Sequence, residues 1–360
     1  MGFLRDIIAA PASWLYGMGV SIRHWLYDTE IKKGQEFDIP IVCVGNLTVG
    51  GTGKTPMTEY LVQVLSTYYY VAVLSRGYKR KTKGFLMCQP NMSYKRIGDE
   101  PKQMKMKFPT IPVAVCEDRR EGIRQLRAKH PEVNLIILDD AFQHRAIEPW
   151  VNIVLMDYSR PIYNDRLLPL GRLRDVRSAL RRANIVITTK CPSSLTPLDM
   201  RLIKGNLELF PYQSLFFTSF KSGEAMPLFS DLSGENPIEK KSNILAMATI
   251  ANPTSFFEYL GNNYNLLGEV VFPDHHTFKM RDIAMIEEKL ASLPPDTKIV
   301  MTEKDAVKLI ASKKIKSETK AKMYCVSVNV KFADDKSEHF MHILSQYVSE
   351  NQKYKITHPE

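Results

Sequence analysis

Apolar runs recur through the first half of the chain and predict buried strands. They lie at residues 39–44, 69–75, 111–116, 135–138, 151–156 and 185–188. Segments with helical spacing lie between several of them, at residues 56–67, 118–129 and 195–208. Because strands that are apolar throughout are covered on both faces, this alternation predicts a mainly parallel sheet with helices packed against it.

A second alternating pattern begins near residue 243. Strands are predicted at residues 243–249, 269–272, 298–302 and 322–328, with helices at residues 254–260, 280–290, 306–310 and 338–348. Between the two patterns, residues 214–229 are typical of two strands about a Ser222-Gly223 turn, and a polar linker follows. We therefore expect an α/β protein with a larger domain over residues 29–215, a β-ribbon and linker over 216–242, and a smaller α/β domain over 243–350.

Residues 1–28 form a separate pattern. The uncharged stretch from Ile7 to Ile22 is shorter than the roughly 20 residues that cross a bilayer, and Pro11 interrupts it. Trp14 and Trp25 suit the lipid headgroup region, and basic residues flank them. Two interpretations stay open: a helix that lies in the membrane interface, or a helix packed against the core of the protein.

Composition narrows the classes of partner only slightly. The chain has 360 residues, enough for two domains, and a net charge of +10. That charge favours an anionic partner, which is nucleic acid, a lipid surface or a phosphorylated substrate.

The five cysteines are odd in number, far apart and without a CxxC pair. They indicate free thiols in a reducing compartment rather than a disulfide framework or a structural zinc site.

The segment GNLTVGGTGKT, residues 45–55, is typical of a phosphate-binding loop between a strand and a helix. Its glycines let backbone N–H groups approach phosphate oxygens, Lys54 would reach the terminal phosphates and the Thr55 hydroxyl would ligate Mg²⁺. Thr48 stands where the motif usually has glycine. The predicted nucleotide-binding residues are Thr48, Val49, Gly50, Gly51, Thr52, Gly53, Lys54 and Thr55.

Asp139 and Asp140 end a predicted strand, at the sheet edge where such folds bind ligands. A strand-terminal turn also explains aspartate there. With a phosphate loop in the same chain, support of the metal by at least one of them is favoured.

Two further segments have plain structural explanations. In GDEP, Asp99 or Glu100 ahead of Pro101 fits a helix cap, and local sequence favours capping over catalysis. In FPDHHTF, His275 and His276 are either a proton-handling pair, part of a metal site, or loop histidines with ordinary hydrogen bonds.

Six arginines lie between residues 165 and 182, and arginine side chains are well suited to bind phosphate oxygens. Nucleic-acid binding is not favoured, because interleaved aromatic residues and a recognised reading module are missing.

Taken in order, several segments resemble the tetraacyldisaccharide 4'-kinases, the lipid A kinases. They are GNLTVGGTGKTP, SRGYKRK, GDEP, DDAFQHR, LLPLGRLRD, IANPTSFFEYL, FPDHHTF and MTEKDAVKL. The resemblance runs from the N-terminal helix to about residue 345. It implies a P-loop NTPase-like domain joined by a β-ribbon to a smaller C-terminal α/β domain, with the nucleotide between them.

The resemblance also implies the reaction. ATP and Mg²⁺ serve transfer of the γ-phosphoryl group to the 4'-hydroxyl of a membrane-embedded acylated disaccharide 1-phosphate, at the cytoplasmic face of the inner membrane. We expect a monomer that contacts the lipid surface and binds no nucleic acid.

Site residues follow from the same resemblance. The base falls on Asp99 and its partner on His275, and the metal and phosphate roles fall on Lys54, Thr55, Asp139 and Asp140. Substrate contacts are expected at Arg76, Gln143, His144 and Arg174, although Ala141 and "PLGRLRD" depart from the usual pattern.

Two other classes remain as alternatives. The first is a membrane-associated nucleotide switch or metallochaperone GTPase, which is disfavoured because TTKCP lacks the aspartate of a guanine-reading motif. The second is a basic membrane- or nucleic-acid-binding protein with a regulatory nucleotide site, which leaves the Asp99 and His275 segments unexplained.

Overall fold

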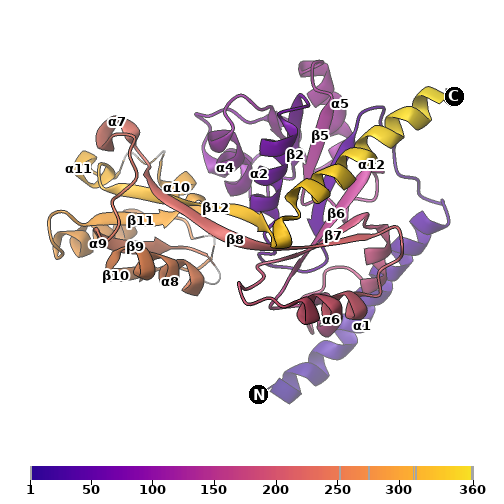
Figure 1. The fold of residues 1–360 in the computed structure, drawn as a ribbon, viewed down its shortest axis with the longest axis horizontal. Coiled ribbons are helices and arrows are strands. Elements are labelled where there is room, and N and C mark those ends of the chain that lie inside the picture. Colours follow the sequence, from indigo (N-terminus) through magenta and orange to yellow (C-terminus); the bar gives the residue numbers. More distant parts are fainter. Residues whose placement is uncertain (1, 251–252, 275, 311, 313, 358–360) are drawn as a thin grey trace.

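The computed structural model describes residues 2–357 except 251–252, 275, 311 and 313, and gives residues 2–8 and 350–357 as helical backbone only (Figure 1). Within these residues, twelve strands form one continuous sheet that belongs to two domains. Part of the sheet lies in each domain, and the long strands β8 and β12 run between them (Figure 1).

The large domain has a mainly parallel sheet, as predicted. Its strands lie side by side in the order β8 (Ser214–Pro227), β7 (Ile185–Thr189), β6 (Val151–Asp157), β1 (Ile41–Asn46), β5 (Leu135–Asp139), β2 (Val71–Ser75), β4 (Val113–Val115) and β3 (Leu86–Met87). Only β3 pairs antiparallel within this part. Its helices are α2 (Lys54–Leu65), α3 (Tyr94–Ile97), α4 (Asp99–Lys107), α5 (Arg119–Lys129) and α6 (Pro197–Leu207).

Strand β1 shows why the apolar run was continuous. Ile41 and Cys43 pack into one core cluster and Val42 and Val44 into another, and all four are fully buried. Both faces of the strand are therefore covered, as in other parallel sheets with helices on each side.

The small domain continues the sheet. Its strands follow in the order β8, β12 (Met323–Phe332), β11 (Lys298–Thr302), β9 (Asn243–Ala248) and β10 (Asn265–Val271). Its helices are α7 (Ser230–Ser233), α8 (Thr254–Asn263), α9 (Met280–Ala291), α10 (Glu303–Leu309) and α11 (Ser317–Lys320).

The predicted hairpin about Ser222-Gly223 is wrong. Residues 214–227 form one strand, β8, whose antiparallel partner is β12. Gly223 faces the Ser327 side chain, which a Cβ would meet, and the pairing shifts register between Val326 and Val328. The glycine therefore marks a bulge in a long ribbon, not a turn.

The last helix, α12 (Ser337–Thr357), also differs from the expected division of the chain. Its residues Phe340, Leu344 and Val348 are buried in a core cluster of the large domain. The chain thus crosses to the small domain along β8, returns along β12 and ends on the large domain (Figure 1).

Candidate active site

The phosphate-binding loop connects β1 to α2, and residues outside the loop form hydrogen bonds that hold it in place. Gly50 and Gly53 have φ values of 110° and 86°, in the region that favours glycine. Thr48 forms an antiparallel bridge with Leu173, and the Val49 N–H donates to the Arg172 carbonyl at 2.8 Å. An extended residue needs no positive φ, which explains why threonine is accommodated at position 48 where glycine is usual.

Asp139 ends β5 beside this loop and is buried. Its Oδ1 accepts from Thr58 Oγ1 at 3.2 Å and its Oδ2 from Ser75 Oγ at 3.3 Å. Burial, followed by the charges of Glu100 and Asp140, raises the pKa of Asp139 to about 7, and Lys54 opposes the shift. Burial of the carboxylate is thus the main reason why Asp139 holds its proton more readily than an exposed aspartate does.

Asp140 has a different environment. Its φ of 49° is unusual for a residue other than glycine and indicates a conformation imposed by its surroundings. Its carboxylate lies 3.8 Å from Lys54 Nζ and forms an ion pair with Arg174. Burial raises the pKa of Asp140, but Lys54 and Arg174 outweigh burial and hold it below the usual range.

These donors fit a magnesium ion that is also bound by nucleotide. No three His, Cys, Asp or Glu side chains of the described residues come together as a ready metal site. Mg²⁺ is commonly bound by one or two carboxylates plus substrate phosphates rather than by a complete protein cage. The Asp139 carboxylate at the end of β5 and the Thr55 hydroxyl at the start of α2 are oxygen donors that match that arrangement.

Asp99 opens α4, and the predicted capping role is wrong. Gly98, with a φ of 98°, occupies the N-cap position, and no side chain caps the helix. Asp99 is the first helical residue and therefore follows the N-cap position. The small domain approaches here: Tyr94 is hydrogen-bonded to Thr277. Burial lowers the pKa of Lys308 on α10, and the charges of Asp305 and then Asp99 oppose that effect.

Of the two histidines of FPDHHTF, the structure describes His276. His275 lies outside the described residues, so its relation to Asp99 stays a prediction. The His276 ring stacks on Phe272 with centroids 4.8 Å apart, and its Nε2 lies 2.9 Å from Asp282 Oδ2. His276 is therefore a loop histidine with an ordinary structural partner.

The predicted substrate residues surround the same edge of the sheet. Arg174 also donates to Asn46 Oδ1, and Gln143 Nε2 donates to the Asn46 carbonyl at 2.8 Å. Burial lowers the pKa of His144 to about 4, with Arg119 as the next cause. Arg76 is exposed, and its charge acts on Arg119.

Arg119, Thr58 and Ser75 were not predicted. Arg119 is buried, and its Nη1 donates to the Cys116 carbonyl at 3.0 Å. Its Nε has no hydrogen-bond partner within the described part of the chain, nor does His144 Nε2. An arginine just after the cap residue Asp118 gives no local sign of burial.

Helix α1 (Gly2–Asp28) packs against the protein, as one of the two interpretations of the N-terminus expects, and its contact with a membrane stays a prediction. One side docks on the large domain: Tyr16 donates to the Arg174 carbonyl at 2.8 Å, and His24 Nε2 lies 2.5 Å from Asp175 Oδ1. The opposite side, at 3.6 residues per turn, is apolar and exposed, with Trp14 at 67% and Trp25 at 56%. None of the described helices is long and apolar enough to span a bilayer.

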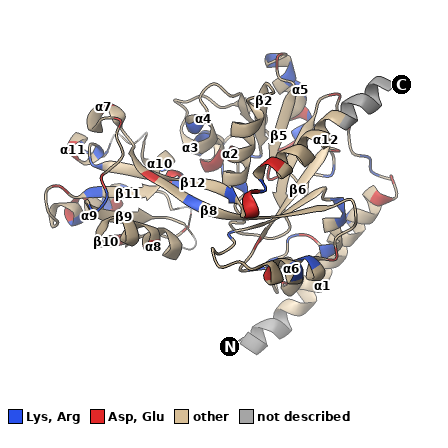
Figure 2. Cartoon of the chain, viewed as in Figure 1, with Lys and Arg blue, Asp and Glu red and all other residues tan. Residues whose placement is uncertain are grey.

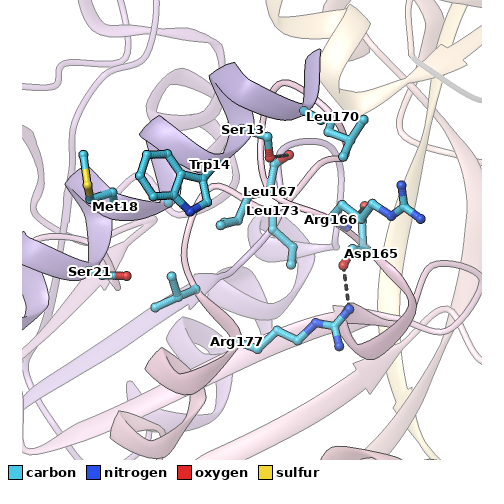
Figure 3. A pocket seen from close by; sticks show the side chains of 13 residues that line it. Ser13, Trp14, Met18, Ser21, Asp165, Arg166, Leu167, Leu170, Leu173 and Arg177 are labelled. Carbon is cyan, nitrogen blue, oxygen red and sulfur yellow. Dashed lines mark hydrogen bonds between the residues drawn. The ribbon is translucent and has the colours of Figure 1, made fainter. Parts of the chain in front are cut away.

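A groove of about 700 Å³ lies between α1 and residues 165–177 (Figure 3). Trp14 and Met18 line it from the helix, and Leu167 and Leu170 line it from the loop (Figure 3). Arg177 donates to the Asp165 carbonyl at 2.7 Å. The groove is apolar with basic residues beside it.

Comparison with known proteins gives one consistent result. The family model for tetraacyldisaccharide-1-P 4'-kinase, LpxK, matches residues 5–348. The tetraacyldisaccharide 4'-kinase of Phocaeicola vulgatus is 46% identical to this chain, and the match covers 95% of both proteins. The tetraacyldisaccharide 4'-kinase of Bacteroides thetaiotaomicron is 41% identical, and the match covers 95% of this chain and 93% of that protein. A crystal structure of LpxK from Aquifex aeolicus in complex with ATP has a TM-score of 0.72 and 27% identity, covering 94% of this chain and 98% of that chain. The chain belongs to the tetraacyldisaccharide-1-P 4'-kinase family.

Proposed function

We propose that this chain is an ATP-dependent kinase that phosphorylates the 4'-hydroxyl of tetraacyldisaccharide 1-phosphate, a step of lipid A biosynthesis. One observation supports this above others. The phosphate loop and the Asp139–Asp140 pair lie at one edge of the parallel sheet, inside a chain that matches the kinase family over residues 5–348.

Each group at this edge has a role that its geometry supports. Backbone N–H groups of the glycine-rich loop and Lys54 bind the nucleotide phosphates. Thr55 and one of Asp139 and Asp140 would hold Mg²⁺, which neutralises charge on the phosphates when bound. Arg174 holds Asp140 and Asn46 together, so it keeps the metal-binding edge next to the phosphate loop.

Asp99 is proposed as the base and His275 as its partner. The contribution of such a base depends on its position against the attacking hydroxyl. Its place at the first turn of α4, facing the small domain, supports that role. His275 would approach from the opposite domain.

We also propose that the enzyme works as a monomer at the cytoplasmic face of the inner membrane. Four acyl chains hold the substrate in the bilayer, because each buried CH₂ contributes about 0.8 kcal/mol. The apolar side of α1 and the groove beside it provide a surface that lies in the interface. Arg166 and Arg177 next to this groove suit anionic headgroups.

The direct test is phosphoryl transfer to purified tetraacyldisaccharide 1-phosphate in mixed micelles with Mg²⁺ and ATP. Mass spectrometry should find a product heavier by one phosphate at the 4' position. Competition between ATP and GTP for the nucleotide site distinguishes an ATP-dependent kinase from a guanine-nucleotide switch, which would prefer GTP. Nucleotide hydrolysis without any lipid product would contradict the proposal.

A further inference from the structure

Two consecutive residues at the end of β7 hold carbonyl groups of the phosphate loop. Thr189 Oγ1 donates to the Thr52 carbonyl at 2.8 Å, and Lys190 Nζ donates to the Gly51 carbonyl. Both residues are far from the loop in sequence, in the TTKCP segment to which the reaction assigns no role. Asn46 adds a third support, since its Nδ2 donates to Thr52 Oγ1 at 2.7 Å.

Lys190 is itself held in place. Its Nζ lies 2.7 Å from Asp157 Oδ2, at the end of the neighbouring strand β6. Asp157 also accepts from the Ser159 N–H at 2.9 Å and the Ser159 hydroxyl at 2.7 Å. The backbone of Lys190 has a φ of 57°, which costs energy for a residue with a side chain. The surrounding structure therefore imposes the direction of this lysine.

Peptide geometry links these contacts to phosphate binding. In a trans peptide the C=O and N–H groups point in opposite directions. A phosphate loop presents N–H groups to the anion, so its carbonyls must face away from it. Fixing the Thr52 carbonyl on Thr189 fixes the Gly53 N–H, and fixing the Gly51 carbonyl on Lys190 fixes the Thr52 N–H. The Thr52 N–H donates inside the loop to the Gly50 carbonyl at 3.1 Å, so the Lys190 contact fixes the internal turn of the loop, and the Thr189 contact fixes the Gly53 N–H.

We propose that Lys190, anchored by Asp157, is a positioning residue that sets the phosphate loop for ATP through the Gly51 carbonyl. The inference rests on the proposed function, because it concerns the same nucleotide. It assigns to Lys190 no contact with the lipid. Loss of the lysine should therefore weaken ATP binding and leave the lipid KM unchanged, whereas a merely structural role would lower stability without that selectivity.

The test compares Lys190→Met, Lys190→Arg and Asp157→Asn in the full-length enzyme. Lys204, an exposed lysine on α6, gives the matched control Lys204→Met. Calorimetry measures the Kd of Mg-ATP, kinetics measure kcat and the KM of each substrate, and thermal unfolding measures Tm. Lys190→Met should raise the Kd and KM of ATP about tenfold, the size expected for losing a hydrogen bond from a charged group. Lys190→Arg should restore most of the loss, and Asp157→Asn should shift ATP binding in the same direction.

The outcomes are separable. Unchanged ATP binding in a folded Lys190→Met enzyme, or a drop in Tm without a change in the Kd of ATP, would overturn the inference. If Lys190→Met does not fold, unchanged ATP binding in Asp157→Asn overturns it instead. If the wild-type enzyme binds Mg-ATP but phosphorylates no lipid, the proposed function fails while the binding comparison still decides the role of Lys190.

Discussion

Lys107 at the end of α4 forms an ion pair with Glu303 at the start of α10, with Nζ 3.2 Å from Oε2. The same Nζ lies 2.7 Å from Oε2 of the buried Glu59. Glu59 belongs to α2, the helix that begins at Lys54 of the phosphate loop. One lysine therefore connects the nucleotide-binding helix to the small domain. Figure 2 shows that both domains carry basic as well as acidic residues.

The first prediction concerns this connection. Lys107→Met should lower the free energy of unfolding by about 2 kcal/mol, because it leaves two poorly solvated carboxylates without their cation. Adding Glu59→Gln to that variant should recover part of the loss, since one of the unpaired charges disappears. Chemical denaturation of the two single variants and the double variant measures the coupling. Purely additive effects would show that the pair contributes nothing.

The second prediction is the pH dependence of the same cluster. Burial and then the charge of Glu303 raise the pKa of Glu59 from 4.5 to about 7, while Lys107 and Gln103 oppose the shift. Between these two values the folded protein binds more protons than the unfolded chain, so this contribution to stability falls as the pH rises. The Tm of the wild type should therefore decrease relative to Glu59→Gln between about pH 5 and pH 8. Parallel Tm curves for the two proteins would contradict this assignment.

Local patterns predicted much of this architecture, for physical reasons. Strands β1 and β5 are buried on both faces, so their apolar runs allow few other structures. The phosphate loop depends on glycines close together in sequence, which a short segment reveals. The pairing of β8 with β12 joins residues about a hundred positions apart, and Gly223 resembles a turn until that partner is present.

The site was predicted less completely. The position of Asp139 and Asp140 beside the phosphate loop was predicted because they lie at the end of an apolar strand. Arg119 was not found, since its burial comes from tertiary packing. Local sequence favoured Asp99 or Glu100 as a helix cap because an acidic residue before proline often has that role, whereas Gly98 takes the position here, and the role of Asp99 as a base stays a prediction. Its proposed partner, His275, stays a prediction.

The third prediction concerns Gly53. Its φ of 86° disfavours any side chain, and a Cβ there would collide with the Phe220 ring on the interdomain ribbon. Gly53→Ala should therefore abolish detectable Mg-ATP binding by calorimetry. Gly19→Ala on α1, where a Cβ meets no neighbouring atom, is the matched control and should bind ATP as the wild type does. Normal ATP affinity in Gly53→Ala would mean that the loop has another working conformation.

The fourth prediction separates the two sides of α1. Trp14→Glu with Trp25→Glu changes only exposed positions, so Tm should stay nearly constant while sedimentation with anionic vesicles is lost. Tyr16→Phe removes a contact to the Arg174 carbonyl and should leave vesicle binding intact. A doubly substituted protein that still sediments with vesicles would assign membrane contact to another surface.

The most direct test of the account is single-turnover phosphoryl transfer by wild-type enzyme and Asp99→Asn, with Mg-ATP affinity measured on the same samples. A general base contributes about 10²–10⁴-fold to such a step. We expect a 4'-phosphorylated lipid from the wild type, a rate lower by that factor in Asp99→Asn, and equal ATP affinity in both. A wild-type rate in Asp99→Asn would contradict the role of Asp99 at the centre of this mechanism.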